Sequence, residues 1–214
     1  RTNIDFMLQG INDRAKIIFV TSTTSQEGKS HTSINLASSL SFSEKKVLLI
    51  ETDIRVPKAT NYLKIKNDIG ITNYIGNDEL KSTDVITKLE DNKYLDVIPS
   101  GIIPPNPSEL LMSDRVGELF EEVKKKYDYI IVDTAAVGLV TDTLLISKYA
   151  DMFVYVVRAN YIDKRQLHIA QTMFTEKRLP NMAILLNAVD YKNGVNYTYG
   201  YGENPSKSKW WKFF

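Results

Sequence analysis

Apolar residues along this chain gather in short runs, and most of the runs are nearly continuous instead of alternating with polar residues. Strands covered by helices on both faces have this pattern, because neither side of such a strand meets water. The pattern predicts six strands, at residues 16–22, 46–53, 94–100, 129–134, 152–158 and 182–188.

Segments with an apolar stripe at helical spacing lie between these runs, and they predict helices at residues 30–44, 108–126, 142–149 and 163–177. Strands that alternate with helices favour an α/β fold: a doubly wound, mostly parallel sheet with right-handed crossovers and helices on both faces. Ligands bind such sheets outside the carboxyl ends of the strands. Functional residues are therefore expected where the predicted strands end.

Composition narrows the possible functions. The 214 residues are 43% hydrophobic, which suits one well-packed domain, and the net charge of +1 gives no reason to expect a nucleic-acid partner. The chain has no cysteine, and His31 and His168 lack the spacing of metal ligands. No apolar run approaches the roughly 18 residues of a membrane span, so we expect a soluble chain. Its helix-like start without a methionine suggests a piece of a larger protein.

The composition changes after residue 190, which predicts a domain over residues 1–190 and a flexible tail over residues 191–214. The tail holds four tyrosines, both tryptophans, and four lysines against one glutamate. The spacing of Tyr197, Tyr199 and Tyr201 could form an edge strand, but the interspersed glycines disfavour one. The aromatic segment Trp210 to Phe214 fits a membrane interface or a second subunit equally well.

Residues 20–30 read VTSTTSQEGKS and have the features of a phosphate-binding loop. A predicted strand leads into the segment and a predicted helix begins near Lys29, so backbone N–H groups would face phosphate oxygens. Lys29 would reach the outer phosphates, and the Ser30 hydroxyl would bind Mg²⁺. Thr23 replaces the first glycine of the usual pattern, which leaves a Ser/Thr turn that caps a helix as the alternative.

Three carboxylates follow two other predicted strands. Glu51 and Asp53 end one strand and Asp133 ends another. A phosphate-loop site holds Mg²⁺ partly through a carboxylate at such a position. A single acid after a strand is usually a helix cap, but three acids together with Gly-Lys-Ser indicate a nucleotide site.

In these motifs the sequence resembles the cytoplasmic kinase domain of bacterial tyrosine kinases, which accompany polysaccharide synthesis and export. The matching segments are QEGKS at the loop, LLIETDIR at residues 48–55, IIVDTAA at residues 130–136 and PPNPSELL at residues 104–111. Three positions depart from the family pattern: Thr23, Glu51 in place of the first aspartate of D-x-D, and Ala136 in place of a proline.

The resemblance implies ATP and Mg²⁺ as cofactors and assigns roles residue by residue. Ser30, Asp53 and Asp133 would hold the metal. Lys29, Glu51, Asp53 and Asp133 would be catalytic, with Glu51 accepting the proton of the incoming tyrosine or binding the metal. The residues implied to contact the nucleotide are Glu27, Gly28, Lys29, Ser30, His31 and Arg55. Arg55 could pair with phosphate or with a carboxylate.

The resemblance also implies partners. Tyr197, Tyr199 and Tyr201 would accept phosphate from a neighbouring subunit. Arg1 looks like the end of a helical motif that packs family members into a ring-forming homo-oligomer. A membrane-embedded polysaccharide co-polymerase would activate the kinase at the cytoplasmic side of the cell membrane and link it to capsular or exopolysaccharide synthesis and export.

Two other functions remain open. A switch ATPase of the MinD/ParA type shares this sheet, but such proteins carry an extra lysine early in the loop, where this chain has Thr24. A catalytically weak nucleotide-binding adaptor would fit a loss of chemistry at Glu51.

Overall fold

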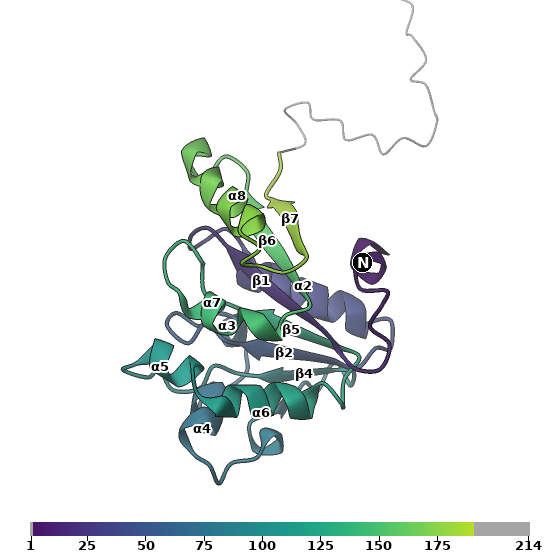
Figure 1. The fold of residues 1–214 in the computed structure, drawn as a ribbon. Coiled ribbons are helices and arrows are strands. Elements are labelled where there is room, and N and C mark those ends of the chain that lie inside the picture. The colour runs from purple at the N-terminus through teal and green to yellow at the C-terminus, as the bar shows by residue number, and fades with distance from the viewer. Residues whose placement is uncertain (1, 191–214) are drawn as a thin grey trace, which may run out of the picture.

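The computed structural model describes residues 2–190, which form seven strands in one sheet flanked by helices (Figure 1). The strand order is β3-β4-β2-β5-β1-β6-β7, and each neighbouring pair is parallel except β3 with β4. The strands are β1 (Lys16–Ser22), β2 (Val47–Glu51), β3 (Thr87–Lys88), β4 (Leu95–Ile98), β5 (Tyr129–Asp133), β6 (Met152–Arg158) and β7 (Met182–Asn187).

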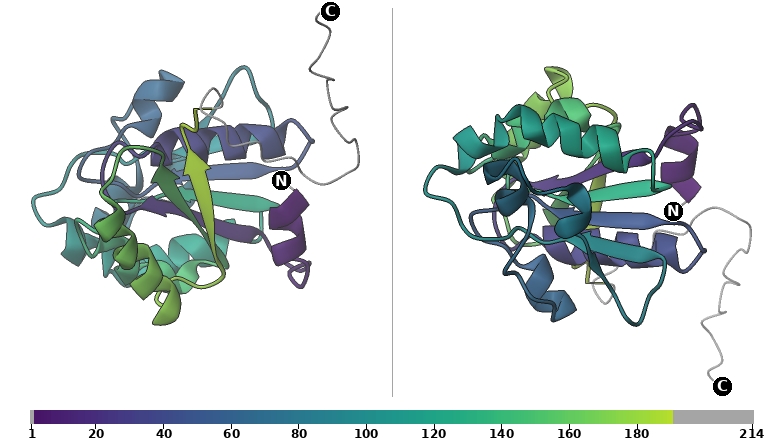
Figure 2. Two further views of the ribbon diagram at one scale, coloured as in Figure 1. Left: turned by 90° about the horizontal axis from the view of Figure 1, so that it is seen from above. Right: turned by 90° about the horizontal axis from the view of Figure 1, so that it is seen from below.

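The helices lie on both faces of this sheet, as two further views show (Figure 2). The α-helices are α1 (Thr2–Met7), α2 (Lys29–Ser41), α3 (Ala59–Leu63), α4 (Ile71–Gly76), α5 (Pro107–Leu111), α6 (Asp114–Val123), α7 (Asp142–Leu145) and α8 (Leu167–Thr175). Short 3₁₀ turns are η1 (Ser82–Asp84), η2 (Ser147–Tyr149) and η3 (Lys164–Gln166). The predicted fold class is confirmed.

The two faces of the sheet bury two separate apolar clusters. One cluster lies under α1 and α2, where Leu8, Ala37 and Leu40 cover the sheet. The other lies under α4, α6 and α8, and its centre is a group of rings in which Phe19 contacts Phe120 and Phe153 at centroid distances of 5.9 and 5.3 Å. All residues of β2 and β5 are buried, which explains their uninterrupted apolar runs.

The structure departs from the predicted elements chiefly in one divided helix and in several short segments. The helix expected at residues 108–126 is divided into α5 and α6, because the Ser113 side chain accepts a hydrogen bond from the backbone N–H of Arg115 and starts a new helix. The two-residue strand β3 and the short helices α3 and α4 were not predicted, since segments of two to six residues show no measurable periodicity.

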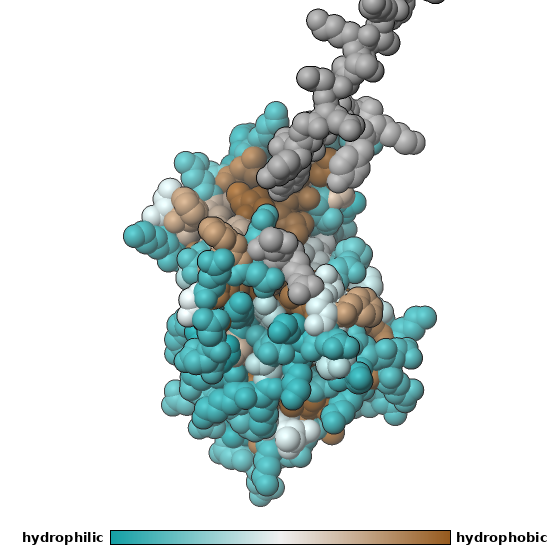
Figure 3. All heavy atoms as spheres, turned by 90° about the vertical axis from the view of Figure 1, so that its right-hand side faces the viewer, coloured by the Kyte–Doolittle hydropathy of each residue, from teal (hydrophilic) through white to brown (hydrophobic). Residues whose placement is uncertain are grey.

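Strand β7 has no fully buried residue. Its residues Ile184, Leu185 and Leu186 are exposed, and apolar side chains gather on that side of the molecule (Figure 3). Within residues 2–190, no helix is long and apolar enough to cross a membrane. The predicted tail, with Tyr197, Tyr199, Tyr201 and the segment from Trp210, lies outside the described residues, as does Arg1.

Candidate nucleotide site

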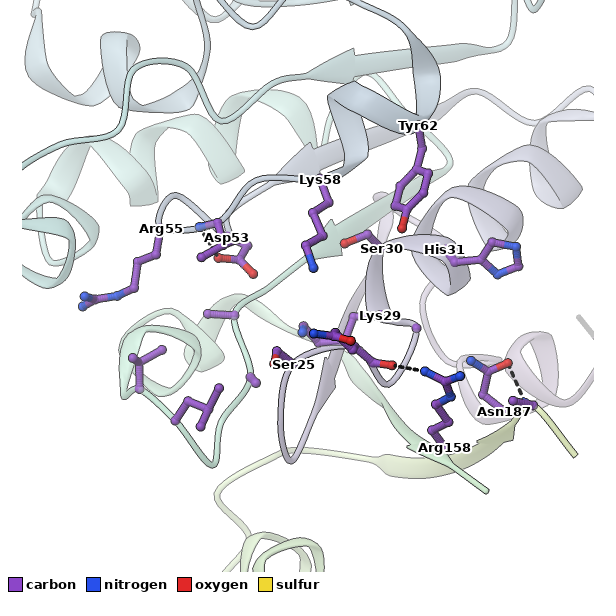
Figure 4. A pocket seen from close by; sticks show the side chains of 18 residues that line it. Ser25, Lys29, Ser30, His31, Asp53, Arg55, Lys58, Tyr62, Arg158 and Asn187 are labelled. Atoms are coloured by element: carbon purple, nitrogen blue, oxygen red, sulfur yellow. Dashed lines mark hydrogen bonds between the residues drawn. The ribbon is translucent and has the colours of Figure 1, made fainter. Parts of the chain in front are cut away.

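A cavity of about 900 Å³ opens at the carboxyl ends of the parallel strands. Its volume is in the range of small-molecule sites. The loop after β1 and the start of α2 form its floor. The segments after β2 and β5 form one side, and the ends of β6 and β7 form the other (Figure 4). The predicted residues that line it are Gly28, Lys29, Ser30, His31, Asp53 and Arg55.

Gly28 makes the turn from the loop into α2. Its φ of +99° lies in the left-handed region that favours glycine. A Cβ at this position would lie 2.2 Å from Nδ2 of Asn187, which donates a hydrogen bond to the Glu27 carbonyl at 2.9 Å. A larger residue would therefore strain the turn and displace the Asn187 side chain from its hydrogen bond to the loop.

Glu27 shapes the loop from within and does not line the cavity. Its fully buried carboxylate accepts hydrogen bonds from the backbone N–H of Thr24 at 2.7 Å and of Arg158 at 3.4 Å. The Arg158 guanidinium in turn donates to the Gln26 carbonyl at 3.1 Å. The structure thus places Glu27 behind the cavity wall, whereas Gly28 and Lys29 face the cavity.

The absence of the loop's first glycine has a structural explanation. The Thr23 hydroxyl is 2.9 Å from the hydroxyl of Tyr155, and both side chains are buried. The Thr23 carbonyl accepts a hydrogen bond from the backbone N–H of Gly138 at 3.1 Å. Thr23 therefore ties the loop to β6 and to the segment after β5.

Removing this hydroxyl should destabilise the protein. Thr23→Val leaves the buried Tyr155 hydroxyl without a partner, so we expect the free energy of unfolding to fall by about 1–3 kcal/mol in urea titrations. Tyr155→Phe should cost a similar amount. The double variant should cost clearly less than the sum, because neither polar group is then left unpaired. Strictly additive costs would show that the hydroxyls do not interact.

Asp133, at the end of β5, is fully buried, and one of its carboxylate oxygens has no hydrogen-bond partner. Its Oδ1 accepts a hydrogen bond from Ser33 at 3.0 Å, while its Oδ2 has no hydrogen-bond partner. Burial, together with the negative charge of Glu51, raises the pKa of Asp133 from 3.8 to about 7, against the lowering influence of Ser30, Lys29 and Ser33. A cation at Oδ2 would satisfy this oxygen and favour the charged form.

This raised pKa makes stability depend on pH. The folded state binds the Asp133 proton more tightly than the unfolded state, so the stabilisation is complete below about pH 4 and disappears as the pH rises through about 7. Without nucleotide, the unfolding free energy of wild type minus that of Asp133→Asn should fall by about 4 kcal/mol across this interval. Urea titrations at several pH values measure it. A constant difference would contradict the burial argument.

Glu51, the last residue of β2, turns its carboxylate to the backbone. One oxygen accepts hydrogen bonds from the N–H groups of Lys58 and Ala59, both at 2.6 Å, and the other from Ser100 at 3.4 Å. Burial raises its pKa, and these three donors oppose the shift. The side chain is fully buried and does not line the cavity, unlike Asp53, which lines it and accepts a hydrogen bond from the Val56 N–H at 3.2 Å.

Arg55 pairs with a carboxylate. Its guanidinium contacts both oxygens of Asp142, at 2.6 and 3.0 Å, and the Ser108 hydroxyl at 3.0 Å. Asp142 begins α7 and is buried, and Ser108 lies in α5, so the pair joins three segments at the rim of the cavity. The sequence allowed either a phosphate or a carboxylate as the partner of Arg55, and in the structure the partner is a carboxylate.

His31 lies at the rim of the cavity. It is exposed, and its ring is 3.0 Å from the Asn35 amide.

Four polar residues outside the sequence motifs also line the cavity: Lys58, Tyr62, Arg158 and Asn187. They belong to three separate parts of the chain and to no recognisable motif. The only sequence signal for Arg158 and Asn187 is that each is a polar residue at the end of an apolar run. Among residues 2–190, no group of three or more His, Cys, Asp or Glu side chains is placed to hold a metal alone.

A parallel sheet, a loop ending in Gly-Lys-Ser before a helix, and a buried acid on the neighbouring strand define a P-loop nucleotide-binding protein. Comparison with known proteins agrees. A family described as an AAA domain matches residues 15–176. The tyrosine-protein kinase CpsD of Streptococcus agalactiae is 36% identical over 212 residues, which cover 98% of this chain and 90% of that protein.

Solved structures give the same result. The kinase domain of the Escherichia coli tyrosine kinase ETK superimposes with a TM-score of 0.82 at 30% identity, covering 94% of this chain and 77% of that one. The septum site-determining protein MinD of Pyrococcus horikoshii, solved with Mg-ADP, has a TM-score of 0.64 at 19% identity, covering 80% and 70%. The chain belongs to the bacterial tyrosine-protein kinases. The predicted family and kinase activity are confirmed, and the likeness to MinD shows the fold alone.

Proposed function

We propose that this chain binds Mg²⁺-ATP in the cavity and transfers the terminal phosphoryl group to tyrosine side chains of a neighbouring copy. The observation that carries this proposal is Asp133. It is a fully buried carboxylate that does not itself line the cavity, but one of its oxygens has no hydrogen-bond partner, and Lys29 and Ser30 at the start of α2 lie close enough to stabilise its charged form. Buried polar groups are almost always paired, so an orphaned one beside a phosphate loop is best explained by a missing ligand.

Lys29 and the first N–H groups of α2 hold the phosphates in this proposal. Lys29 is largely buried, lines the cavity and makes no ion pair within the described part of the chain, so its ammonium is free for an anion. The N-terminus of the 13-residue helix α2 adds unpaired N–H groups and the positive end of the helix dipole. Arg158 and Asn187 line the opposite side of the cavity and leave room there for the base.

The residues present fit a magnesium ion. Mg²⁺ takes oxygen ligands and keeps several waters, so it needs few protein ligands. Ser30 and Asp133 would hold the ion, and Asp53 would contact it through bound water. When bound, the ion neutralises phosphate charge as the phosphoryl group moves.

In this proposal Asp53, and not Glu51 as expected from the sequence, accepts the proton of the incoming tyrosine hydroxyl. All three hydrogen bonds that Glu51 accepts come from the backbone, and its carboxylate does not line the cavity. Asp53 lines the cavity, where it would accept the proton of an incoming hydroxyl. The tyrosine oxygen would form a bond to the terminal phosphorus while the bond from that phosphorus to the oxygen of the second phosphate breaks; the hydroxyl proton would go to Asp53, and ADP would leave.

The acceptors and partners rest on likeness to the family. Tyr197, Tyr199 and Tyr201 would be the acceptors, a ring of subunits would bring them to neighbouring cavities, and a membrane-embedded polysaccharide co-polymerase would activate the kinase at the cytoplasmic side of the membrane. The kinase would thereby regulate capsular or exopolysaccharide synthesis and export.

Incubation of the purified chain with Mg²⁺-ATP tests the proposal. Phosphotyrosine within residues 191–214 supports it. Release of inorganic phosphate without phosphotyrosine would instead show a switch ATPase, and bound nucleotide that is never turned over would show an adaptor.

A further inference from the structure

Lys58 points into the cavity from the segment between β2 and α3 (Figure 4). It lies on the side of Asp53 and Ser30, away from Arg158 and Asn187. Its ammonium makes no hydrogen bond or ion pair within the part of the chain that the structure describes. No recognised motif of the sequence includes it.

The other cations of the cavity are engaged, apart from Lys29. Arg55 binds Asp142 through two hydrogen bonds. Arg158 donates to the Gln26 carbonyl and lies over the Tyr161 ring, 4.9 Å from its centroid. Among the described residues that line the cavity, Lys29 and Lys58 are thus the two cationic side chains left to neutralise a triphosphate.

Glu51 holds the backbone that carries Lys58. The two shortest of its hydrogen bonds, both 2.6 Å, come from the N–H groups of Lys58 and Ala59 at the start of α3. A buried charge-assisted contact of this kind is strong and geometrically specific. Because β2 is buried and paired with a strand on each side, the carboxylate at its end fixes where the Lys58 main chain lies.

We propose that Lys58 is a second catalytic cation of this site, contacting the terminal phosphoryl oxygens of bound ATP, and that Glu51 is the positioning residue that holds it there. The proposal rests on the proposed function and deepens it. It also explains why this chain carries glutamate at residue 51. The N–H groups of Lys58 and Ala59 lie at the reach of a glutamate, and an aspartate, one methylene shorter, would fall short of them.

The first test compares Lys58→Ala and Lys58→Arg with Lys66→Ala, a matched control at an exposed lysine nearby that does not line the cavity. Calorimetry measures the binding of Mg²⁺-AMP-PNP, which has a third phosphate, and of Mg²⁺-ADP, which lacks it. Lys58→Ala should weaken AMP-PNP binding by roughly 10- to 100-fold, the value of a charged hydrogen bond, and change ADP binding by less than about twofold. Lys58→Arg should recover most of the loss, and Lys66→Ala should bind both nucleotides normally.

An equal loss for both nucleotides, or no loss for either, would overturn the role of Lys58 at the terminal phosphate. These outcomes are independent of turnover. If the wild type binds AMP-PNP yet forms no phosphotyrosine, the proposed kinase function fails while the Lys58 comparison can still be read.

The second test separates positioning from proton acceptance at Glu51. Glu51→Gln keeps the length and the carbonyl oxygen that accepts from Lys58 and Ala59, so it should retain AMP-PNP affinity within about threefold, one weak hydrogen bond being lost at most. Glu51→Asp keeps the charge but has a shorter side chain, so its affinity for AMP-PNP should fall to that of Lys58→Ala. Weaker AMP-PNP binding by Glu51→Gln than by Glu51→Asp would overturn the positioning role of Glu51. Circular dichroism checks that each variant is folded, and the Lys58 series decides alone if the Glu51 variants unfold.

Discussion

Replacing Lys29 by methionine is expected to reduce phosphotyrosine formation by roughly 10³-fold, the loss that follows removal of one charge-stabilising group from a transition state. Methionine fills the volume of the lysine stem but carries no charge. Lys29 is largely buried at the start of α2, and its ammonium makes no ion pair within the described part of the chain. Transfer of radiolabelled phosphate from Mg²⁺-ATP measures the loss, and nucleotide binding should fall in parallel.

The matched control for this variant is Lys45→Met, which changes an exposed lysine beyond the end of α2 in the same way. It should leave transfer unchanged. Thermal unfolding should show both variants to be folded, because neither side chain contributes to the apolar clusters. Transfer by Lys29→Met above about a tenth of the wild-type rate would remove the lysine from the mechanism.

The second large effect concerns the acceptors. Replacing Tyr197, Tyr199 and Tyr201 together by phenylalanine should remove most phosphotyrosine and leave AMP-PNP binding intact, because the cavity is built from residues before 190. Residues 191–214 hold four lysines and one glutamate, a charge of +3. Three phosphates would bring this to about −1.5 to −3. Phosphorylation would therefore reverse the sign of the charge on this segment.

Mass spectrometry of the incubated protein measures this effect site by site. Tyr161→Phe is the control, because Tyr161 is an exposed tyrosine of the folded domain. A phosphotyrosine signal that persists undiminished in the triple variant would place the acceptors elsewhere in the chain.

The sheet could be predicted from the sequence because its central strands are buried on both sides. Strands β2 and β5 are wholly apolar until they end in an acid, so both their type and their end are visible. The helices α3 and α4 could not be predicted, because five or six residues cover less than two turns and their apolar residues show no repeat.

Site residues could be predicted only where they directly follow or end a recognisable strand. Lys29 and Ser30 follow one strand, and Asp53 and Asp133 follow two others, so a parallel sheet brings them to one edge. Sequence shows that an acid ends a strand but not where its carboxylate points. Glu51 and Glu27 both turn inward to backbone N–H groups, which depends on loops that no local pattern describes. Lys58, Arg158 and Asn187 reach the cavity only through the tertiary fold.

The hydrogen bond from Asn187 to the Glu27 carbonyl links the phosphate loop to the outermost strand, three residues before the described part of the chain ends. Strand β7 is paired on one side only and exposes much of its surface, so its amide protons should exchange with deuterated solvent faster than those of β5. A nucleotide that immobilises the loop would slow this exchange. Binding of a nucleotide in the cavity would then reduce the motion of β7, close to the point where the tyrosine-bearing segment begins.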